Sequence, residues 1–297
     1  MSESAALVEP SGSGRQLASQ SVRSRAGRLT VHVLLLLVVA ATSLPLLYMV
    51  STSLKPEGTE YDFPIRWIPD PPVWENYLKA FRAVPTLTFL RNTLVITVLS
   101  LVGDLLSASL VAYGFARLRF PGREALFTVL LATIMLPFFV VMIPLFVLYR
   151  SLGWVNTFYP FIVPSFFGGH PLYIFLLRQF YLTLPRELDD AARIDGAGFF
   201  RTWWSVLLPL TGPALATVAI MSLIFNWNNF TGPLILLNSR DRFTLALGIR
   251  LFSDQYRMLL NQTMAYTTMM TLPIVAVFFL FQKYFVRGIN MTGLTGR

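Results

Sequence analysis

Four of the chain's 15 acidic residues fall within one short stretch, and their spacing is the most informative chemical feature of the sequence. They are Glu187, Asp189, Asp190 and Asp195. Pro185 precedes them and suits the first turn of a helix, where its missing N–H would be unpaired anyway. The helix dipole stabilises acids near that turn, and Gly196 can end the helix in a left-handed conformation. The stretch therefore predicts a short, exposed, charged helix that binds a partner.

No set of residues in the chain predicts catalysis or a resident cofactor. Cysteine is absent, which excludes disulfides and thiolate metal sites, and two histidines are a poor basis for a metal site. The sequence shows no Ser/His/Asp set, no carboxylate pair in a cleft and no G-x-x-x-x-G-K-[ST] phosphate loop. We therefore expect a chain that is not an enzyme and that holds no cofactor, metal or ATP of its own.

The composition is that of a membrane protein. Hydrophobic residues make up 55% of the chain and charged residues only 13%, which is the wrong balance for a soluble domain of this length. The formal charge of +9 could indicate binding to nucleic acid. However, the basic residues lie in short loops between apolar runs, which is the pattern that orients membrane helices. We expect membrane lipid, and no nucleic acid, around this chain.

Long intervals with few or no charged residues predict the membrane spans. Each interval provides the roughly 20 apolar residues that a transmembrane helix needs. They are 33–54, 93–116, 125–149, 151–177, about 206–230, and 258–282. The predicted fold is thus an all-α membrane protein with six transmembrane helices. Prolines in the later spans, such as Pro137 and Pro209, remove backbone hydrogen bonds and can bend these helices.

Arginines in the short loops predict the orientation of the spans. Three lie between residues 117 and 124, and one lies between residues 150 and 157, which favours a cytoplasmic N-terminus and C-terminus. The apolar run that follows the first arginines is too long for a secretory signal and has no clear cleavage site after it. The predicted parts are a disordered cytoplasmic tail at 1–28, a six-helix domain at 29–290 with an inner loop at 181–205, and a flexible cytoplasmic tail at 291–297.

The acidic stretch also resembles a known motif. Residues 190–196 read D-A-A-R-I-D-G, and V-L-L-P follows at 206–209. This resembles the EAA loop of permease subunits of ABC importers, E-A-A-x3-G-x9-I-x-L-P. Asp190 replaces Glu and Val206 replaces Ile, and both changes keep the chemistry. Residues 112–123 and 283–297 are similar to patterns of the carbohydrate branch of this family, although the tail departs at 290–292.

The resemblance covers residues from about 33 to the end and implies a function. It implies a type I importer fold in a bacterial or archaeal cytoplasmic (inner) membrane, and import of a sugar or sugar derivative. The implied partners are a homologous second permease subunit, two ABC ATPase subunits that hold ATP and Mg, and an extracytoplasmic solute-binding protein. The residues implied to couple to the ATPases are Arg186, Glu187, Leu188, Asp189, Asp190, Ala191, Ala192, Arg193, Asp195 and Gly196.

Two outer segments are candidates for contact with a partner. Residues 227–256 resemble a block of maltose-type permeases that faces the solute-binding protein, and an ordinary surface turn is the alternative. The candidate contacts there are Asn238, Ser239, Arg240, Asp241, Gly248, Gln255 and Tyr256. Residues 55–90 hold four prolines between Phe63 and Trp74 and predict an extended, aromatic-rich loop. Its aromatic residues could anchor the loop at the membrane interface or contact a partner.

Asp104 stands near the middle of the second span, where an ionised carboxylate costs several kcal/mol unless it is paired or hydrated. It could line the substrate path. Alternatively, it could be a packing residue that is protonated or bonded to Ser100, Ser107 or Ser109. We prefer the packing interpretation, because the family pattern requires no acid at this position.

Two other classes of membrane protein compete with the importer interpretation. A secondary carrier would usually show paired interrupted helices or inverted repeats, and none is visible in the sequence. A membrane receptor fits the span pattern but leaves the 185–213 stretch unexplained.

Overall fold

The computed structural model describes residues 13–252 and 259–292, and this part of the chain forms helices and loops without a strand. The long helices are α1 (Ser13–Ser53), α3 (Thr86–Arg117), α7 (Pro171–Thr183), α11 (Gly212–Trp227) and α14 (Leu260–Thr292). Between them lie α2 (Glu75–Ala83), α4 (Arg123–Ile134), α5 (Phe138–Ser151), α6 (Tyr159–Ile162), α8 (Glu187–Ile194), α9 (Phe199–Thr202), α10 (Leu208–Leu210), α12 (Thr231–Leu236) and α13 (Leu245–Gly248). The 3₁₀ helices are η1 (Val163–Phe166), η3 (Arg240–Arg242) and η4 (Ile249–Phe252), and η2 (Trp203–Leu207) is a π-helical turn between α9 and α10.

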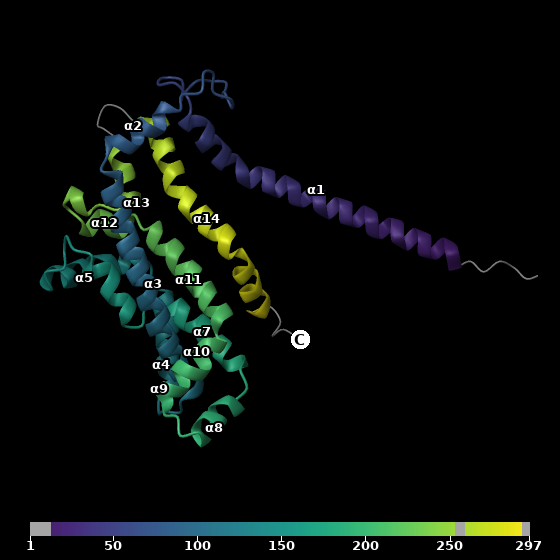
Figure 1. The fold of residues 1–297 in the computed structure, drawn as a ribbon, viewed down its shortest axis with the longest axis vertical. Helices are drawn as coiled ribbons and strands as arrows, with labels where there is room; N and C mark the ends of the chain where they lie inside the picture. Colours follow the sequence, from purple (N-terminus) through teal and green to yellow (C-terminus); the bar gives the residue numbers. More distant parts are fainter. Residues whose placement is uncertain (1–12, 253–258, 293–297) are drawn as a thin grey trace, which may run out of the picture.

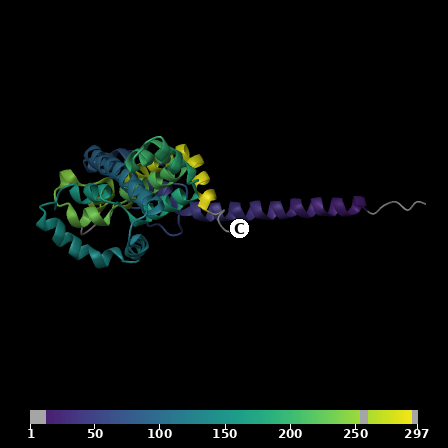
Figure 2. The same cartoon turned by 90° about the horizontal axis from the view of Figure 1, so that it is seen from below.

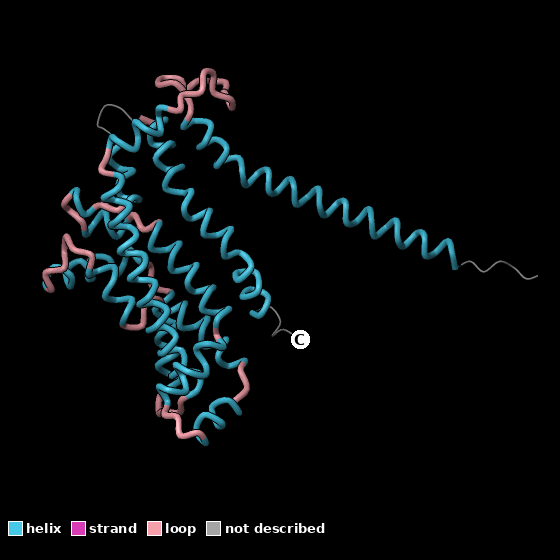
Figure 3. Tube along the Cα trace, in the orientation of Figure 1, coloured by secondary structure: helices cyan, strands magenta, loops and turns pink. Residues whose placement is uncertain are grey.

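Helix α3 is the central element of the bundle. It packs against α7 and α11, and α14 lies on the far side of α11 (Figures 1 and 3). One face of α3 carries Ala108, Ala112 and Ala116 at four-residue spacing, and all three are buried. These small side chains let the backbones approach closely, with Leu177 of α7 and Val218 of α11 filling the interface. Small-residue packing therefore holds the three central helices together.

The described residues contain four helical segments that are long and apolar enough to cross a membrane. Two bent helix pairs each supply one more crossing if the pair is counted as a single span, which agrees with the six predicted spans. The segment that corresponds to the fourth predicted span, 151–177, runs over Tyr159–Thr183 and so begins later in the chain. A charge-free interval marks where a helix is allowed but does not fix where it begins.

The third and fifth predicted spans are not single straight helices. Helices α4 and α5 meet at 101°, and the break lies just before Pro137, which begins α5 from an extended conformation. The segments Phe199–Leu210 and Gly212–Trp227 meet at 83°, between Pro209 and Pro213. The predicted spans at 125–149 and 206–230 are therefore present as bent helix pairs, each with its break next to a proline, as the sequence allowed. The prolines indicated a bend, but their side chains do not encode its size.

Helix α1 extends away from the bundle (Figures 1 and 2). Its apolar segment, Thr30–Ser53, is exposed along almost its whole length. The prediction that 1–28 is disordered is wrong for residues 13–28, which continue α1 as helix. Extending a helix that already exists is much easier than starting one, so the apolar span can support these residues. Residues 1–12 and 293–297 of the two predicted tails lie outside the described part of the chain.

The end of α1 nearest the bundle is fixed by polar contacts. Asn76 of α2 donates its Nδ2 to the carbonyl oxygens of Ser53 and Lys55, each at 2.9 Å. The hydroxyls of Ser53 and Tyr77 lie 2.8 Å apart. The predicted extended segment 55–90 is thus a loop only in its first half, because α2 and the start of α3 occupy the second half.

Candidate functional site

The acidic stretch forms helix α8 at the end of the bundle opposite α2 (Figure 1). Its first turn holds Glu187, Asp189 and Asp190, as the sequence predicted. Gly196 follows the helix with a φ of 75°, which confirms the expected left-handed glycine. The N–H of Gly196 donates to Arg193 O at 3.0 Å and that of Ala197 donates to Ala192 O at 2.8 Å. This pair of bonds ends the helix sharply and satisfies its last carbonyls.

One side of α8 packs onto the transmembrane helices. Leu188 packs against the core cluster of α3 and α7, and Ala192 is buried. Asp189 forms an ion pair with Arg117 at the end of α3, with Nη1 and Oδ2 3.3 Å apart. These two side chains are only 13% and 4% exposed, respectively. Arg117 also donates Nη2 to the carbonyl of Leu184 at 2.8 Å, so it ties both the helix and the preceding loop to α3.

The assignment of all ten 186–196 residues to a partner surface therefore needs correction. Leu188, Asp189 and Ala192 contact their own chain, because their position on the helix turns them towards α3 and α7. The other side of α8 is exposed. Its residues are Arg186, Glu187, Asp190, Ala191, Arg193, Asp195 and Gly196, together with Ile194.

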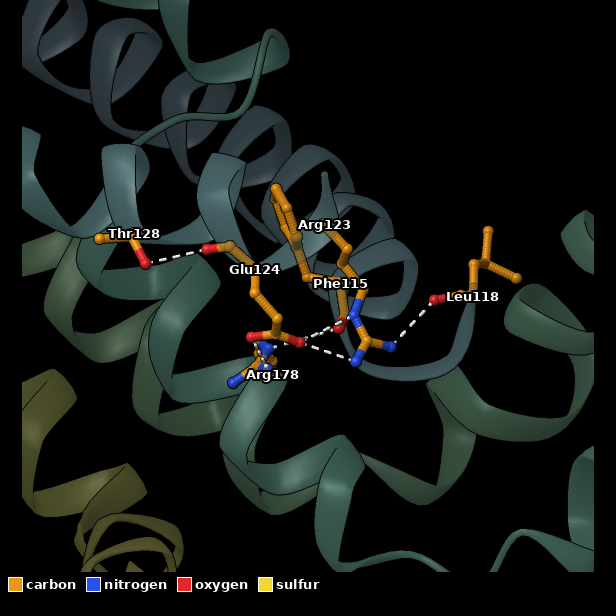
Figure 4. Close-up of polar contacts among 6 residues, drawn as sticks. All are labelled: Phe115, Leu118, Arg123, Glu124, Thr128 and Arg178. Atoms are coloured by element: carbon orange, nitrogen blue, oxygen red, sulfur yellow. Dashed lines mark hydrogen bonds and ion pairs between the residues drawn. The ribbon is translucent and has the colours of Figure 1, made fainter. Parts of the chain in front are cut away.

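Two arginines, Arg123 and Arg178, contact Glu124 and nearby backbone carbonyls at the start of α4 (Figure 4). Arg123 at the start of α4 donates to Leu118 O at 3.1 Å and to Glu124 Oε1 at 2.7 Å. Arg178 of α7 lies 3.5 Å from Glu124 Oε2 and donates Nε to Phe115 O at 3.3 Å. The network connects α3, α4 and α7 in a region where the apolar spans end. These contacts therefore brace the end of the bundle from which α8 projects.

Exposed apolar side chains surround the outer side of α8. Ile194 is 87% exposed, and Phe199 and Phe200 of α9 are also exposed. Arg193 lies over the ring of Phe199, 5.7 Å from its centroid. Large apolar groups grouped at the tip of a charged loop mark an interaction surface. Phe199 and Phe200 were missed from sequence, although two adjacent phenylalanines beside Gly198 in a charged loop are a signal that could have identified them.

The outer candidate loop is held down by asparagines that the sequence analysis did not single out. Asn156 accepts hydrogen bonds at Oδ1 from the backbone N–H groups of Asn238 and Ser239, each at 3.0 Å. Its Nδ2 donates to Ser239 Oγ at 2.7 Å. From α3, the buried Asn92 donates to the carbonyls of Asp241 and Phe243 at 2.8 and 3.0 Å. The loop is therefore a fixed surface.

Only some of the candidate contact residues in this loop are exposed. Asn238, Arg240 and Asp241 are exposed, and Ser239 is partly exposed. Gly248 is buried, and a Cβ there would lie 2.6 Å from the Tyr266 hydroxyl and 2.8 Å from the Phe89 ring. Its placement on a contact surface is therefore wrong, because close packing explains this glycine. Gln255 and Tyr256 lie outside the described residues.

We expect replacement of Asn156 by glycine to loosen the outer loop. Glycine keeps the backbone conformation, since Asn156 has a φ of 59°, and removes only the side-chain bonds. Each bond is worth about 1 kcal/mol, so the amides of 238 and 239 should exchange with deuterium about tenfold faster or more. The matched control is Asn238→Ala, whose side chain makes no hydrogen bond in the described structure. Unchanged exchange in Asn156→Gly would show that Asn156 does not fix the loop.

Asp104 lies in the interior, midway along α3. The predicted bond to Ser100, Ser107 or Ser109 on the same helix is not formed. Instead, Ser222 of α11 donates Oγ to Asp104 Oδ2 at 2.6 Å. The partner is 118 residues away in sequence, so no local pattern could have identified it.

Comparisons with known proteins agree with the motif. Residues 104–291 match the family described as "Binding-protein-dependent transport system inner membrane component". The arabinooligosaccharides transport system permease protein AraQ of Halalkalibacterium halodurans is 36% identical, over 85% of this chain and 91% of the relative. The galactooligosaccharides transport system permease protein GanQ of Bacillus subtilis is 30% identical, over 94% and 100%. The sn-glycerol-3-phosphate transport system permease protein UgpE of Yersinia enterocolitica is 32% identical, over 87% and 94%.

A solved structure has the same fold. It is the crystal structure of a bacterial ABC transporter involved in the import of the acidic polysaccharide alginate. The two chains superpose with a TM-score of 0.76 at 23% identity, over 89% of this chain and 98% of the other. The secondary-carrier and receptor alternatives do not account for these matches. The chain therefore belongs to the family of binding-protein-dependent transport system inner membrane components.

Proposed function

We propose that this chain is a membrane-spanning permease subunit of an ABC importer for a sugar or sugar derivative. In this proposal it couples ATP hydrolysis on partner ATPases to alternating access, and it has no ATPase site of its own. The names of the relatives support the substrate class, since they describe transport of arabinooligosaccharides, galactooligosaccharides and sn-glycerol 3-phosphate. The observation that carries the proposal is helix α8, which is clamped to the bundle on one side and exposed on the other.

The two sides of α8 suit a coupling element. The ion pair of Arg117 with Asp189 and the burial of Ala192 attach α8 to α3 and α7, so a displacement of α8 is passed to the spans. A partner shifts a conformational equilibrium only if it binds the two states differently. An ATPase bound to the outer side of α8 would apply that difference here, through the exposed acids and the apolar group of Ile194, Phe199 and Phe200.

The remaining partners follow from the other surfaces. The separated α1 leaves a long apolar helix and one side of the bundle uncovered, which suits lipid and a homologous second permease subunit. The fixed loop of Asn238, Arg240 and Asp241 lies at the opposite end from α8 and suits a solute-binding protein. Two ATPase copies carrying ATP and Mg would complete the importer. The arginines near α8 support a cytoplasmic location for this end of the bundle and for both termini in the proposed importer.

Charge reversal at Asp190 tests the coupling role. Asp190 is exposed on the outer side of α8, so Asp190→Lys places a positive charge against the presumed binding surface without touching the packed side. We expect transport of labelled sugar by the assembled importer to fall at least about tenfold, and ATPase co-purification to fall with it. Asp190→Glu is the matched control, because it keeps the charge and should transport normally.

Two outcomes of this experiment would contradict the proposal. If Asp190→Lys retains both ATPase binding and uptake, the exposed side of α8 is not the coupling surface. If the wild-type chain brings down no ATPase at all, the importer function itself is wrong.

A further inference from the structure

A cavity of about 530 Å³ opens within this single chain, between the α4–α5 bend, α7, α11 and α12. Asp104 of α3 forms part of its wall. Cavities of this size are typical of small-molecule sites, which usually combine apolar walls with a few placed polar groups. Packing alone does not explain why Asp104 lies beside this cavity, because a carboxylate that only packs between helices needs no open space next to it.

Asp104 is held rigidly at the cavity wall. The residue is only 4% exposed, and Ser222 donates to Oδ2 at 2.6 Å. Asn226 donates Nδ2 to the Ser222 hydroxyl at 3.2 Å, which fixes that serine in turn. On the other side, a Cβ on Gly169 would lie 2.5 Å from Asp104 Oδ1. The glycine therefore leaves room for this oxygen, and its φ of 57° also favours glycine.

In the described part of the chain, no lysine or arginine side chain pairs with Asp104. Among the residues that the structure describes, it forms no ion pair, and no lysine or arginine lines the cavity. A carboxylate in a membrane span is costly unless other groups satisfy it. Ser222 and Ser165 take up part of its acceptor capacity, and the remainder suits further hydroxyl groups, because an ionised carboxylate accepts several hydrogen bonds. A phosphate or carboxylate ligand would meet no positive charge here.

The walls of the cavity differ in polarity. The polar lining includes His170, Tyr173 and Asn226, and the His170 ring packs against Tyr173 and, edge-on, against Phe225, with ring centroids 5.2 and 5.8 Å apart. The side chains of α5 that line the cavity are apolar except for Tyr149. A sugar ring has the same division, since its hydroxyls form a polar edge and its C–H groups an apolar face. The cavity is thus complementary to an uncharged saccharide.

We propose that this cavity is a transient binding site for one unit of a neutral saccharide during passage, and that Asp104 accepts hydrogen bonds from its hydroxyls. The site discriminates against anionic solutes such as glycerol phosphates and acidic polysaccharides. This replaces the packing interpretation of Asp104 that the sequence favoured. The inference rests on the proposed import function and adds to it which subunit contacts the solute and which charge class it accepts.

The test uses the complete importer in proteoliposomes. The probes are radiolabelled arabinobiose, galactobiose and maltose, with sn-glycerol 3-phosphate as the anionic probe. We expect the wild type to take up at least one neutral probe and not the anionic one. Asp104→Asn keeps the size of the side chain and a bond to Ser222, so the chain should assemble. Its uptake should nevertheless fall at least about tenfold, while ATPase stimulation by the loaded binding protein persists.

A matched control lies on the same helix. Ser109 is buried, bonds only to Leu106 O of its own helix at 3.0 Å and does not line the cavity, so Ser109→Ala should match the wild type. Undiminished uptake by Asp104→Asn overturns this inference alone. A parallel loss of uptake and ATPase stimulation assigns Asp104 a structural role and also overturns it, as does efficient wild-type uptake of sn-glycerol 3-phosphate. If the wild type takes up no probe in an ATP-dependent way, the import function fails as well.

Discussion

Ala191→Arg is expected to abolish transport while the chain still inserts and folds. Ala191 is on the exposed side of α8, where its side chain makes no packing contact that an arginine would disrupt. A long, strongly hydrated cation there would prevent close approach of an ATPase to the helix. The measurement is sugar uptake together with co-purification of the ATPase, and both should fall to background.

Two further variants separate docking from folding. Ala191→Ser keeps a small side chain and should transport normally. Ala192→Arg places the same cation one position on, in a buried site, and should lower the yield of folded protein instead. If Ala191→Arg retains full ATPase binding and transport, α8 is not the docking helix and the proposed function loses its main support.

Arg117→Met is expected to destabilise the chain and to separate α8 from the spans. The substitution removes the ion pair with Asp189 and the bond to Leu184 O, and leaves a nearly buried carboxylate without its partner. Breaking a buried pair by removing one member costs about 3–5 kcal/mol. We expect a lower thermal unfolding temperature of the purified complex. ATP hydrolysis should continue in the surviving protein without a matching rate of sugar uptake.

The double variant Arg117→Met/Asp189→Leu provides the control. Removing both charges eliminates the uncompensated carboxylate, so most of the lost stability should return. Transport should recover only in part, because the bond to Leu184 O stays absent. Equal stability of Arg117→Met and wild type would show that the ion pair does not attach α8.

The helix α8 was predictable because its signals are local. Acids in the first turn and Gly196 after the last are read directly from sequence, and no atom lies within 4 Å of a Cβ placed on Gly196, so only the backbone conformation requires glycine. The division of the helix into two sides was not predictable. Asp189 and Asp190 are chemically alike, and only the positions of α3 and Arg117 decide which of them is buried.

Features that depend on contacts between distant parts of the chain were likewise not predictable from local sequence. Apolar length predicted the crossings, but the 101° bend of α4 and α5 and the start of the fourth span depend on how the helices pack. The partner of Asp104 and the clamp of Asn156 on the outer loop join residues that are far apart in the chain. Gly248 was assigned to a surface by resemblance, whereas the contacts with Phe89 and Tyr266 show why a buried glycine is needed there.

The separation of α1 from the bundle has a consequence for biosynthesis. Although its end contacts α14, most of the first span to leave the ribosome finds no surface of its own chain to pack on. It needs none, because a helix satisfies its backbone groups internally and its apolar side chains are stable in lipid. Insertion of α1 can therefore be complete before the later spans exist, and the arginines ahead of it can set the topology early. Insertion of α1 and assembly of the bundle thus become separate events, which meet at the end of α1, where it contacts α14 and where Asn76 donates to Ser53 O.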